Sequence, residues 1–177
     1  MTFGRYTPLM SEVPSQGITI RTATSEDADG ITRAYIESAE HHTQLDPERY
    51  AVPAVEAIAA RYREGRQHPP QTEEESVTLV AQIGGEIVGF VDARLGRSPD
   101  PMHREMLYCH IVEIAVSVAH QRKGIGERLL RAAEDWGREH GAELASLEYL
   151  TANTRAASFY QERMGYRPAA VIAVKRL

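Results

Sequence analysis

A short loop between a β-prone run and an amphipathic run has the residue types that bind phosphate groups. Residues 121–126 read QRKGIG and follow the segment LYCHIVEIAVSV after two residues, Ala119 and His120. Gly124 and Gly126 let a ligand approach the backbone, and the first turn of the following helix offers N–H groups with partial positive charge. Arg122 and Lys123 add positive charge. We expect this loop to hold a pyrophosphate, the alternative being a strand-to-helix turn whose glycines only ease packing.

The spacing of the glycines argues against two other nucleotide-binding loops. A Rossmann fingerprint, G-x-G-x-x-G, requires a third glycine where this sequence has Leu129. A Walker loop ends in Gly-Lys followed by Ser or Thr, and the sequence has no such tripeptide. Dinucleotide and ATP loops are therefore disfavoured.

Two motifs in this chain resemble those of the GNAT superfamily of N-acetyltransferases. The loop QRKGIG, after Ile-Ala-Val at 114–116, is similar to the family signature Q/R-x-x-G-x-G/A. The segment NTRAASFY at 153–160, followed by Gly165-Tyr166, is similar to the family's N-x-x-A-x-x-x-Y and its G-F/Y pair. The resemblance extends from Ile18 to the C-terminus. One departure is VAH at 118–120, where many members carry a proline.

The resemblance implies acetyl-CoA as the cosubstrate and a sheet that splays between the strand ending near Val118 and the strand over 144–150. The pantetheine arm would lie in that gap, where it would pair with backbone groups of Ile114, Ala115 and Val116. The amide of Val116 would also polarise the thioester carbonyl, and the side chain of Asn153 would hydrogen-bond the arm. The pyrophosphate would be held by amides of the loop: Arg122, Lys123, Gly124, Ile125, Gly126 and Glu127.

Tyr160 is the expected general acid, because the family places a tyrosine seven residues after the asparagine of its second motif. Its phenol would protonate the departing thiolate. The competing interpretation is a core aromatic beside Phe159. Adjacent helical residues point about 100° apart, so we expect only one of the two rings to face the core.

Three side chains are candidates for the general base that deprotonates the amine. Glu113 lies among apolar residues in a strand, and Glu148 lies in the next strand, so either carboxylate can be desolvated with a raised pKa. In some family members that acetylate protein N-termini, the base is a glutamate five residues before the asparagine, and Glu148 matches that offset. His110 is the third candidate, and a water chain or a purely solvent-facing role for both carboxylates stays open. We favour Glu113 slightly.

Strand alternation places Glu113 on the face opposite His110 unless a bulge intervenes. His41 and His42 are expected in the loop between the first two helices, which by resemblance lines the acceptor pocket. A metal there would need further ligands, and Asp46 is the only near candidate. We therefore expect no metal.

The patterns predict the elements that must position these residues. A strand begins at Ile18, helices follow over 28–38 and 53–64, and a Gly84-Gly85 hairpin joins strands over 77–83 and 86–95. Further elements are a strand over 107–118, a helix over 125–140, a strand over 144–150, a helix over 154–164 and a strand over 166–174. This order predicts an α/β or α+β mixed sheet. By resemblance the sheet is mostly antiparallel, is splayed between its fourth and fifth strands and is flanked by about four helices.

Composition limits the class of protein. A chain of 177 residues with 25% charged residues and a net charge of -5 fits one domain, expected over 18–177 after a flexible arm over 1–17, and argues against nucleic-acid binding. The single Cys109 cannot form an internal disulfide, and no stretch has the roughly 20 apolar residues of a membrane helix, so we expect a cytoplasmic protein.

We expect an N-acetyltransferase that moves acetyl from acetyl-CoA to a primary amine of a small molecule or protein, by direct attack in a ternary complex. The alternative is a non-catalytic acyl-CoA-binding regulatory module with the same fold. A homodimer is left open.

Overall fold

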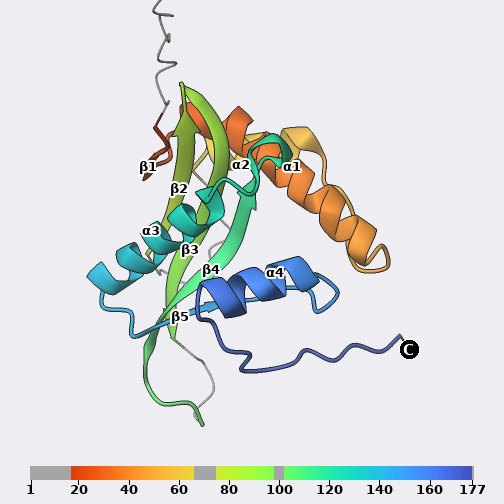
Figure 1. The fold of residues 1–177 in the computed structure, drawn as a ribbon, viewed down its shortest axis with the longest axis vertical. Coiled ribbons are helices and arrows are strands. Elements are labelled where there is room, and N and C mark those ends of the chain that lie inside the picture. Colours follow the sequence, from red (N-terminus) through yellow and green to blue (C-terminus); the bar gives the residue numbers. More distant parts are fainter. Residues whose placement is uncertain (1–16, 66–74, 98–101, 177) are drawn as a thin grey trace, which may run out of the picture.

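One sheet with helices on both faces makes up the described part of the chain, which comprises residues 17–65, 75–97 and 102–176 of the computed structural model (Figure 1). The strands are β1 (Thr19–Thr22), β2 (Ser76–Ile83), β3 (Glu86–Arg97), β4 (Leu107–Val116) and β5 (Leu144–Leu147). The helices are α1 (Ala28–Leu45), α2 (Val55–Arg63), α3 (Ile125–Glu139) and α4 (Thr154–Ser158). The predicted mixed sheet is confirmed. The expected arm lies outside the described residues apart from Gly17.

The sheet has the order β1-β2-β3-β4-β5, with antiparallel pairs up to β4 and a parallel pair between β4 and β5. β5 pairs only with residues 108–111 of β4. Within the described residues, 112–116 of β4 have a strand on the β3 side alone. This one-sided pairing is the splay expected between the fourth and fifth strands.

Three local predictions need correction. The strand expected over 166–174 does not form: Val171 is 85% exposed and Ile172 67% exposed, and Pro168 has no N–H to offer a ladder. The strand expected over 144–150 ends at Leu147. His41 and His42 lie not in a loop but in α1, because nothing breaks that helix before Asp46, whose helical conformation is disfavoured by the next residue, Pro47.

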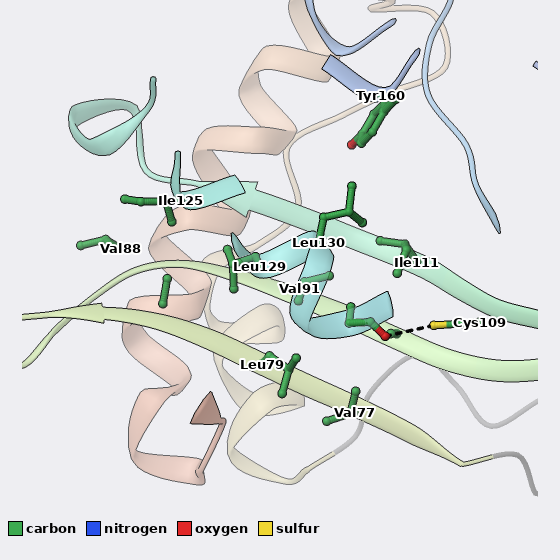
Figure 2. Close-up of a cluster of buried hydrophobic side chains, with 13 residues drawn as sticks. Val77, Leu79, Val88, Val91, Cys109, Ile111, Ile125, Leu129, Leu130 and Tyr160 are labelled. Atoms are coloured by element: carbon green, nitrogen blue, oxygen red, sulfur yellow. Dashed lines mark hydrogen bonds between the residues drawn. The ribbon is translucent and has the colours of Figure 1, made fainter. Parts of the chain in front are cut away.

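Each face of the sheet buries its own apolar cluster. On one face Leu129 of α3 packs in a cluster with Val91 of β3 and Cys109 of β4 (Figure 2). On the other face α1 and α2 cover a cluster that includes Phe90 and Val80, both fully buried. The Cys109 thiol donates to the Ala133 carbonyl at 3.5 Å, and burial raises its pKa to about 11, which keeps it unreactive.

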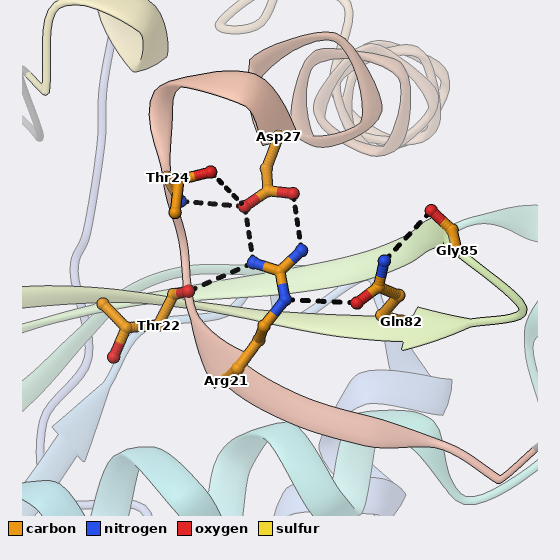
Figure 3. A network of polar contacts seen from close by, with 6 residues as sticks. All are labelled: Arg21, Thr22, Thr24, Asp27, Gln82 and Gly85. Carbon is orange, nitrogen blue, oxygen red and sulfur yellow. Dashed lines mark hydrogen bonds and ion pairs between the residues drawn. The ribbon is translucent and has the colours of Figure 1, made fainter.

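A polar network fixes the start of α1 against the sheet edge (Figure 3). The Arg21 guanidinium on β1 donates to both Asp27 oxygens, at 2.6 and 2.8 Å, and to the Gln82 side chain on β2 at 3.1 Å. The hydrogen bond from Arg21 lowers the Asp27 pKa from 3.8 to about 2. Because the folded-state pKa is depressed, this contribution to stability is present above about pH 4 and is lost as the pH falls through 2.

Two glycines of α3 give a matched test of the packing between α3 and β4. A Cβ at Gly137 would lie 2.4 Å from the Cys109 Cβ, whereas one at Gly126 would meet its neighbours at 3.8 Å. We expect Gly137→Ala to lower the free energy of unfolding, because overpacking costs about 1–3 kcal/mol and outweighs a helix-propensity gain of up to about 1 kcal/mol. Gly126→Ala should leave it unchanged or raise it. Denaturant unfolding of both variants checks this, and equal stability would show that α3 can shift away from β4.

Candidate active site

A β-bulge at Val112 decides which side chains of β4 share a face. Asp92 of β3 lies opposite Glu113, and the next β3 residue, Ala93, lies opposite Ile111, so Val112 is the extra residue. His110 lies opposite Arg94. Because Asp92 and Arg94 point to the same side of β3, Glu113 and His110 share a face, the one covered by α1 and α2. Strict alternation, which separates them, is therefore wrong here.

Glu113 is a partly buried carboxylate that can exchange a proton near neutral pH. Burial, and after it the negative charge of Asp92, raise its pKa from 4.5 to about 7. Two groups oppose this: the Ser38 hydroxyl of α1, which donates to Oε1 at 3.4 Å, and the positive charge of Arg61. A carboxylate in this range is deprotonated often enough at neutral pH to act as a base.

Glu148 and His110 lie near each other but in different surroundings. Glu148 is exposed, one residue beyond the end of β5, so the desolvation expected for it is absent. His110 Nδ1 lies 3.1 Å from the Ser146 hydroxyl. Burial and the charge of Arg94 lower the His110 pKa, against an opposing effect of Glu148, which leaves a neutral imidazole at pH 7.

Tyr160 is buried in a π-helical turn, Phe159–Arg163, that continues α4. Its hydroxyl points toward β4 (Figure 2). Burial raises its pKa to about 12, and the negative charge of Glu113 acts in the same direction, so the phenol keeps its proton at neutral pH. Among the described residues no partner hydrogen-bonds this hydroxyl.

The aromatic surroundings of Tyr160 differ from the expectation. Its ring centroid lies 5.2 Å from that of Phe159 and 5.5 Å from that of Tyr149. Both Phe159 and Tyr160 pack against the cluster under α3, although a 100° offset predicted that only one would. Tyr160 is thus part of the core through its ring and directed toward β4 through its hydroxyl.

The loop before α3 has the backbone that its glycines predict. Gly124 is the N-cap of α3 with φ 77°, and Arg122 also has a positive φ of 62°. The Gly126 Cα faces the gap between β4 and α4, since an added Cβ would lie 3.8 Å from side-chain atoms of Val116 and Phe159. Ile125 is buried in the core. The first-turn amides of α3 therefore remain at the surface while the helix is anchored beneath them.

Two charged side chains of this loop, Lys123 and Glu127, already have partners. Lys123 donates to the Ala119 carbonyl at 3.0 Å. Glu127 accepts from Arg131 at 3.0 Å and from Arg163 at 2.7 Å, which joins the first turn of α3 to the π-helical turn. The Glu127 carboxylate is therefore occupied, and the group expected to contact a phosphate is the Glu127 amide.

The end of β4 presents backbone groups to the gap. The Ser117 amide donates to the Val88 carbonyl of β3 at 2.9 Å, and because amide directions alternate along a strand, the Val116 amide points away from β3. The Val116 carbonyl accepts from the Gln121 side chain at 3.0 Å. Ile114 and Val116 pack toward α3, whereas Ala115 packs toward α1 and α2.

Asn153 caps α4 with its side chain. Its Oδ1 accepts from the Ala156 amide at 3.0 Å, so only its NH₂ group is available to a ligand. The loop entry, where many members of the resembled family have proline, is fixed differently: the Val118 amide donates to Glu37 of α1 at 2.7 Å. A proline at 118 could not make this bond.

His41 and His42 form no metal site in the described residues, where no group of three His, Cys, Asp or Glu side chains is arranged to hold an ion. His42 Nδ1 lies 2.8 Å from the Ser38 carbonyl. No helix in residues 17–65, 75–97 and 102–176 is long and apolar enough to span a membrane. The expectations that the protein binds no metal and does not span a membrane stay predictions.

Asp92 is the site residue that the motifs did not identify. It is 2% exposed and lies across from Glu113. A sequence signal existed, because Asp92 interrupts the apolar run that follows Glu86 in the strand EIVGFVDARL. Buried carboxylates are rare unless they are paired, so this residue was a candidate on burial grounds.

Residues 34–166 match the profile of the acetyltransferase (GNAT) family. An uncharacterized N-acetyltransferase, YhfO, of Bacillus subtilis is 37% identical over 93 residues, which cover 52% of this chain and 59% of that protein. An N-alpha-acetyltransferase of Sulfurisphaera tokodaii is 31% identical over 108 residues, 56% of this chain and 62% of that protein. The acetyl transferase GW6a of Oryza sativa is 32% identical over 105 residues, 53% of this chain but only 24% of that protein. The matches thus cover less than two thirds of these relatives.

Solved structures share the fold at low identity. The tetramutant of the BH1408 protein from Bacillus halodurans has a TM-score of 0.74 at 22% identity, over 90% of this chain and 99% of that one. The aminoglycoside N-acetyltransferase AAC(6')-Iy in complex with CoA has a TM-score of 0.65 at 17% identity, over 91% of this chain and 95% of that one. At these identities the likeness concerns the fold.

Proposed function

This chain is a member of the acetyltransferase (GNAT) family, and we propose that it moves the acetyl group of acetyl-CoA to a primary amine. The resemblance inferred from the two sequence motifs is thereby confirmed. The observation that carries the proposed activity is the placement of Glu113, a carboxylate with a pKa near 7, and Tyr160, a protonated phenol, on either side of the end of β4.

The cosubstrate site in this proposal is the loop before α3 together with the gap between β4 and β5. Gly124 has a positive φ, and Gly126 has no side chain. Both features would let a pyrophosphate approach the first-turn amides of α3. The NH₂ group of Asn153 and the backbone at 114–116 would bind the pantetheine arm. The complex of AAC(6')-Iy with CoA, a protein of the same fold, supports CoA as the ligand class.

Acetyl-CoA supplies a thioester, and the residues of this chain would move the protons. Glu113 would accept one proton from the neutral amine, directly or through water, as the nitrogen lone pair attacks and the carbon–nitrogen bond forms. The Val116 amide donates to the thioester oxygen as negative charge develops there. Tyr160 gives its proton to the sulfur as the carbon–sulfur bond breaks. The reaction needs both substrates bound together, so it proceeds in a ternary complex.

The proposal also covers the class of acceptor and the cellular location of the enzyme. Relatives named as an N-alpha-acetyltransferase and as aminoglycoside acetyltransferases support an amine acceptor, of a protein or of a small molecule. We infer a cytoplasmic enzyme with one domain over 18–177. A non-catalytic acyl-CoA-binding module is the second candidate, favoured only by the use of Asn153 as a helix cap.

A turnover screen tests the activity. Purified protein is incubated with acetyl-CoA and representatives of polyamines, aminoglycosides, amino acids and peptide N-termini, with mass detection of each product. We expect a mass gain of one acetyl group on at least one amine class, with equal release of free CoA. CoA binding without any acetylated product would favour the non-catalytic module.

Replacing each carboxylate separately tests which one is the base. In the wild-type enzyme kcat/KM should fall as the pH drops through about 7, because protonated Glu113 cannot accept a proton. We expect Glu113→Gln to lower the rate and to lose this acidic limb, and Glu148→Gln to keep it. The pH dependence of kcat/KM is the measurement, since a lowered rate alone also follows from a misplaced acceptor. If both variants keep the limb, His110 or a water chain is the base.

A further inference from the structure

Asp92 lies directly behind Glu113 and is closed off from solvent. The two residues are cross-strand partners on β3 and β4, and both face α1 and α2 because of the bulge at Val112. Asp92 is 2% exposed, whereas Glu113 is only partly buried. An acceptor can therefore reach Glu113 but not Asp92, and any effect of Asp92 on the reaction must pass through Glu113.

The hydrogen bonds decide which of the two carboxylates keeps its negative charge. Asp92 Oδ2 accepts from the Tyr62 hydroxyl at 2.8 Å, and Oδ1 accepts from the Thr78 hydroxyl at 2.7 Å. Arg61 Nη2 lies 3.9 Å from Oδ2. Glu113 has a single long bond, from Ser38 at 3.4 Å. Burial raises the pKa of Asp92, but the two hydroxyl donors and the charge of Arg61 oppose that effect and favour the ionised form. Glu113 has fewer such donors, so of the two carboxylates Asp92 is the better stabilised anion.

Among the charges that act on Glu113 in the described part of the chain, Asp92 is the one that raises its pKa. Four elements present titratable or polar groups to it: Tyr35 and Ser38 from α1, Arg61 and Tyr62 from α2, Asp92 from β3, and Tyr160 from the π-helical turn. On its own strand, His110 shares the face and is neutral at pH 7. Arg61 is the positive charge in this set and favours ionised Glu113. Asp92 and Arg61, whose charged groups lie 3.9 Å apart, therefore have opposite effects on the pKa of Glu113.

We propose that Asp92 is a positioning residue of this enzyme, which holds a sealed negative charge behind Glu113 and so adds to the burial of Glu113 in making it bind and release a proton near neutral pH. Tyr62 and Thr78 keep that charge in place by donating to both of its oxygens. The inference deepens the proposed function, because it rests on Glu113 being the base. Without the buried charge, Glu113 would become a weaker base that is deprotonated at lower pH.

Carboxyl ¹³C NMR of the full chain tests the coupling without any need for turnover. Glutamate is labelled at its carboxyl carbon, and the Glu113 signal is assigned by its loss in Glu113→Gln. In Asp92→Asn we expect the Glu113 titration midpoint to move to lower pH by about one unit or more, because a neighbouring like charge is removed. The acidic limb of kcat/KM should move by the same amount. An unmoved NMR midpoint in folded Asp92→Asn would overturn the role of Asp92.

A second variant and a control keep the test decisive. Tyr62→Phe keeps the ring and removes one donor to Asp92, so Asp92 should take up a proton more readily and the Glu113 midpoint should again fall. Asp29→Asn removes an exposed carboxylate that pairs with Arg63 of α2 at 2.6 Å, and it should leave the midpoint unchanged. An NMR midpoint that moves while the rate profile stays fixed would instead overturn Glu113 as the base. The two failures are therefore distinguishable.

Discussion

Replacing Tyr160 with phenylalanine is expected to lower turnover by about 100-fold to 10,000-fold, the usual contribution of a general acid, while CoA affinity stays nearly unchanged. The substitution removes the hydroxyl that points toward β4 and keeps the ring that packs with Phe159 and Tyr149. Because burial raises the Tyr160 pKa to about 12, the wild-type phenol is fully protonated at neutral pH and ready to donate. The loss should therefore lie in kcat rather than in binding.

Single-turnover kinetics under saturating acetyl-CoA and amine measure this effect on the chemical step. Tyr149→Phe is the matched control, since it removes a hydroxyl from the same aromatic group, one that accepts from Gln161 at 2.6 Å. We expect this control to keep most of the activity. Thermal unfolding should give similar midpoints for both variants. Wild-type turnover in folded Tyr160→Phe would leave Tyr160 with a packing role only.

Introducing tryptophan at Gly126 is expected to weaken CoA binding far more than it unfolds the chain. The side chain would project between Val116 and Phe159, into the gap that the pantetheine arm would occupy. A steric cost of about 1–3 kcal/mol corresponds to a loss of roughly 5-fold to 150-fold in affinity. Isothermal titration with CoA and with acetyl-CoA measures it.

Gly126→Ala is the control for this prediction, because its Cβ would make ordinary contacts at 3.8 Å. Its CoA affinity should stay close to that of the wild type. If folded Gly126→Trp bound CoA as tightly as the wild type, the ligand would have to lie elsewhere, and the glycines of the loop would serve the strand-to-helix turn alone.

The sequence patterns predicted best where one local rule acts alone. The hairpin between β2 and β3 follows from paired glycines, Gly84 and Gly85, which both have a positive φ. The helix α3 follows from its apolar periodicity and from Gly124 at its N-cap. The candidate loop directly precedes α3, and β3 of the hairpin pairs with β4, the strand of Glu113, so the positions of the candidate site along the chain could be predicted.

The remaining features depend on contacts that a single sequence does not reveal. The bulge at Val112 arises from the pairing register of β3 and β4, and strict alternation cannot anticipate it. Asp92 becomes relevant only once that register places it behind Glu113. The segment after Pro168 has a strand-like composition, but composition cannot supply a partner strand. Tertiary pairing, rather than local propensity, decided each of these cases.

The one-sided pairing of residues 112–116 of β4 also links ligand binding to the stability of the fold. Such a stretch is a sheet edge inside the molecule, with backbone donors and acceptors on one side that no neighbouring strand satisfies. A cofactor arm that bonds these groups binds the native chain and not the unfolded one. By mass action, a ligand at 100 times its Kd then adds about 2.7 kcal/mol to the free energy of unfolding. The cellular supply of the cosubstrate would in this way set how much of the protein is folded.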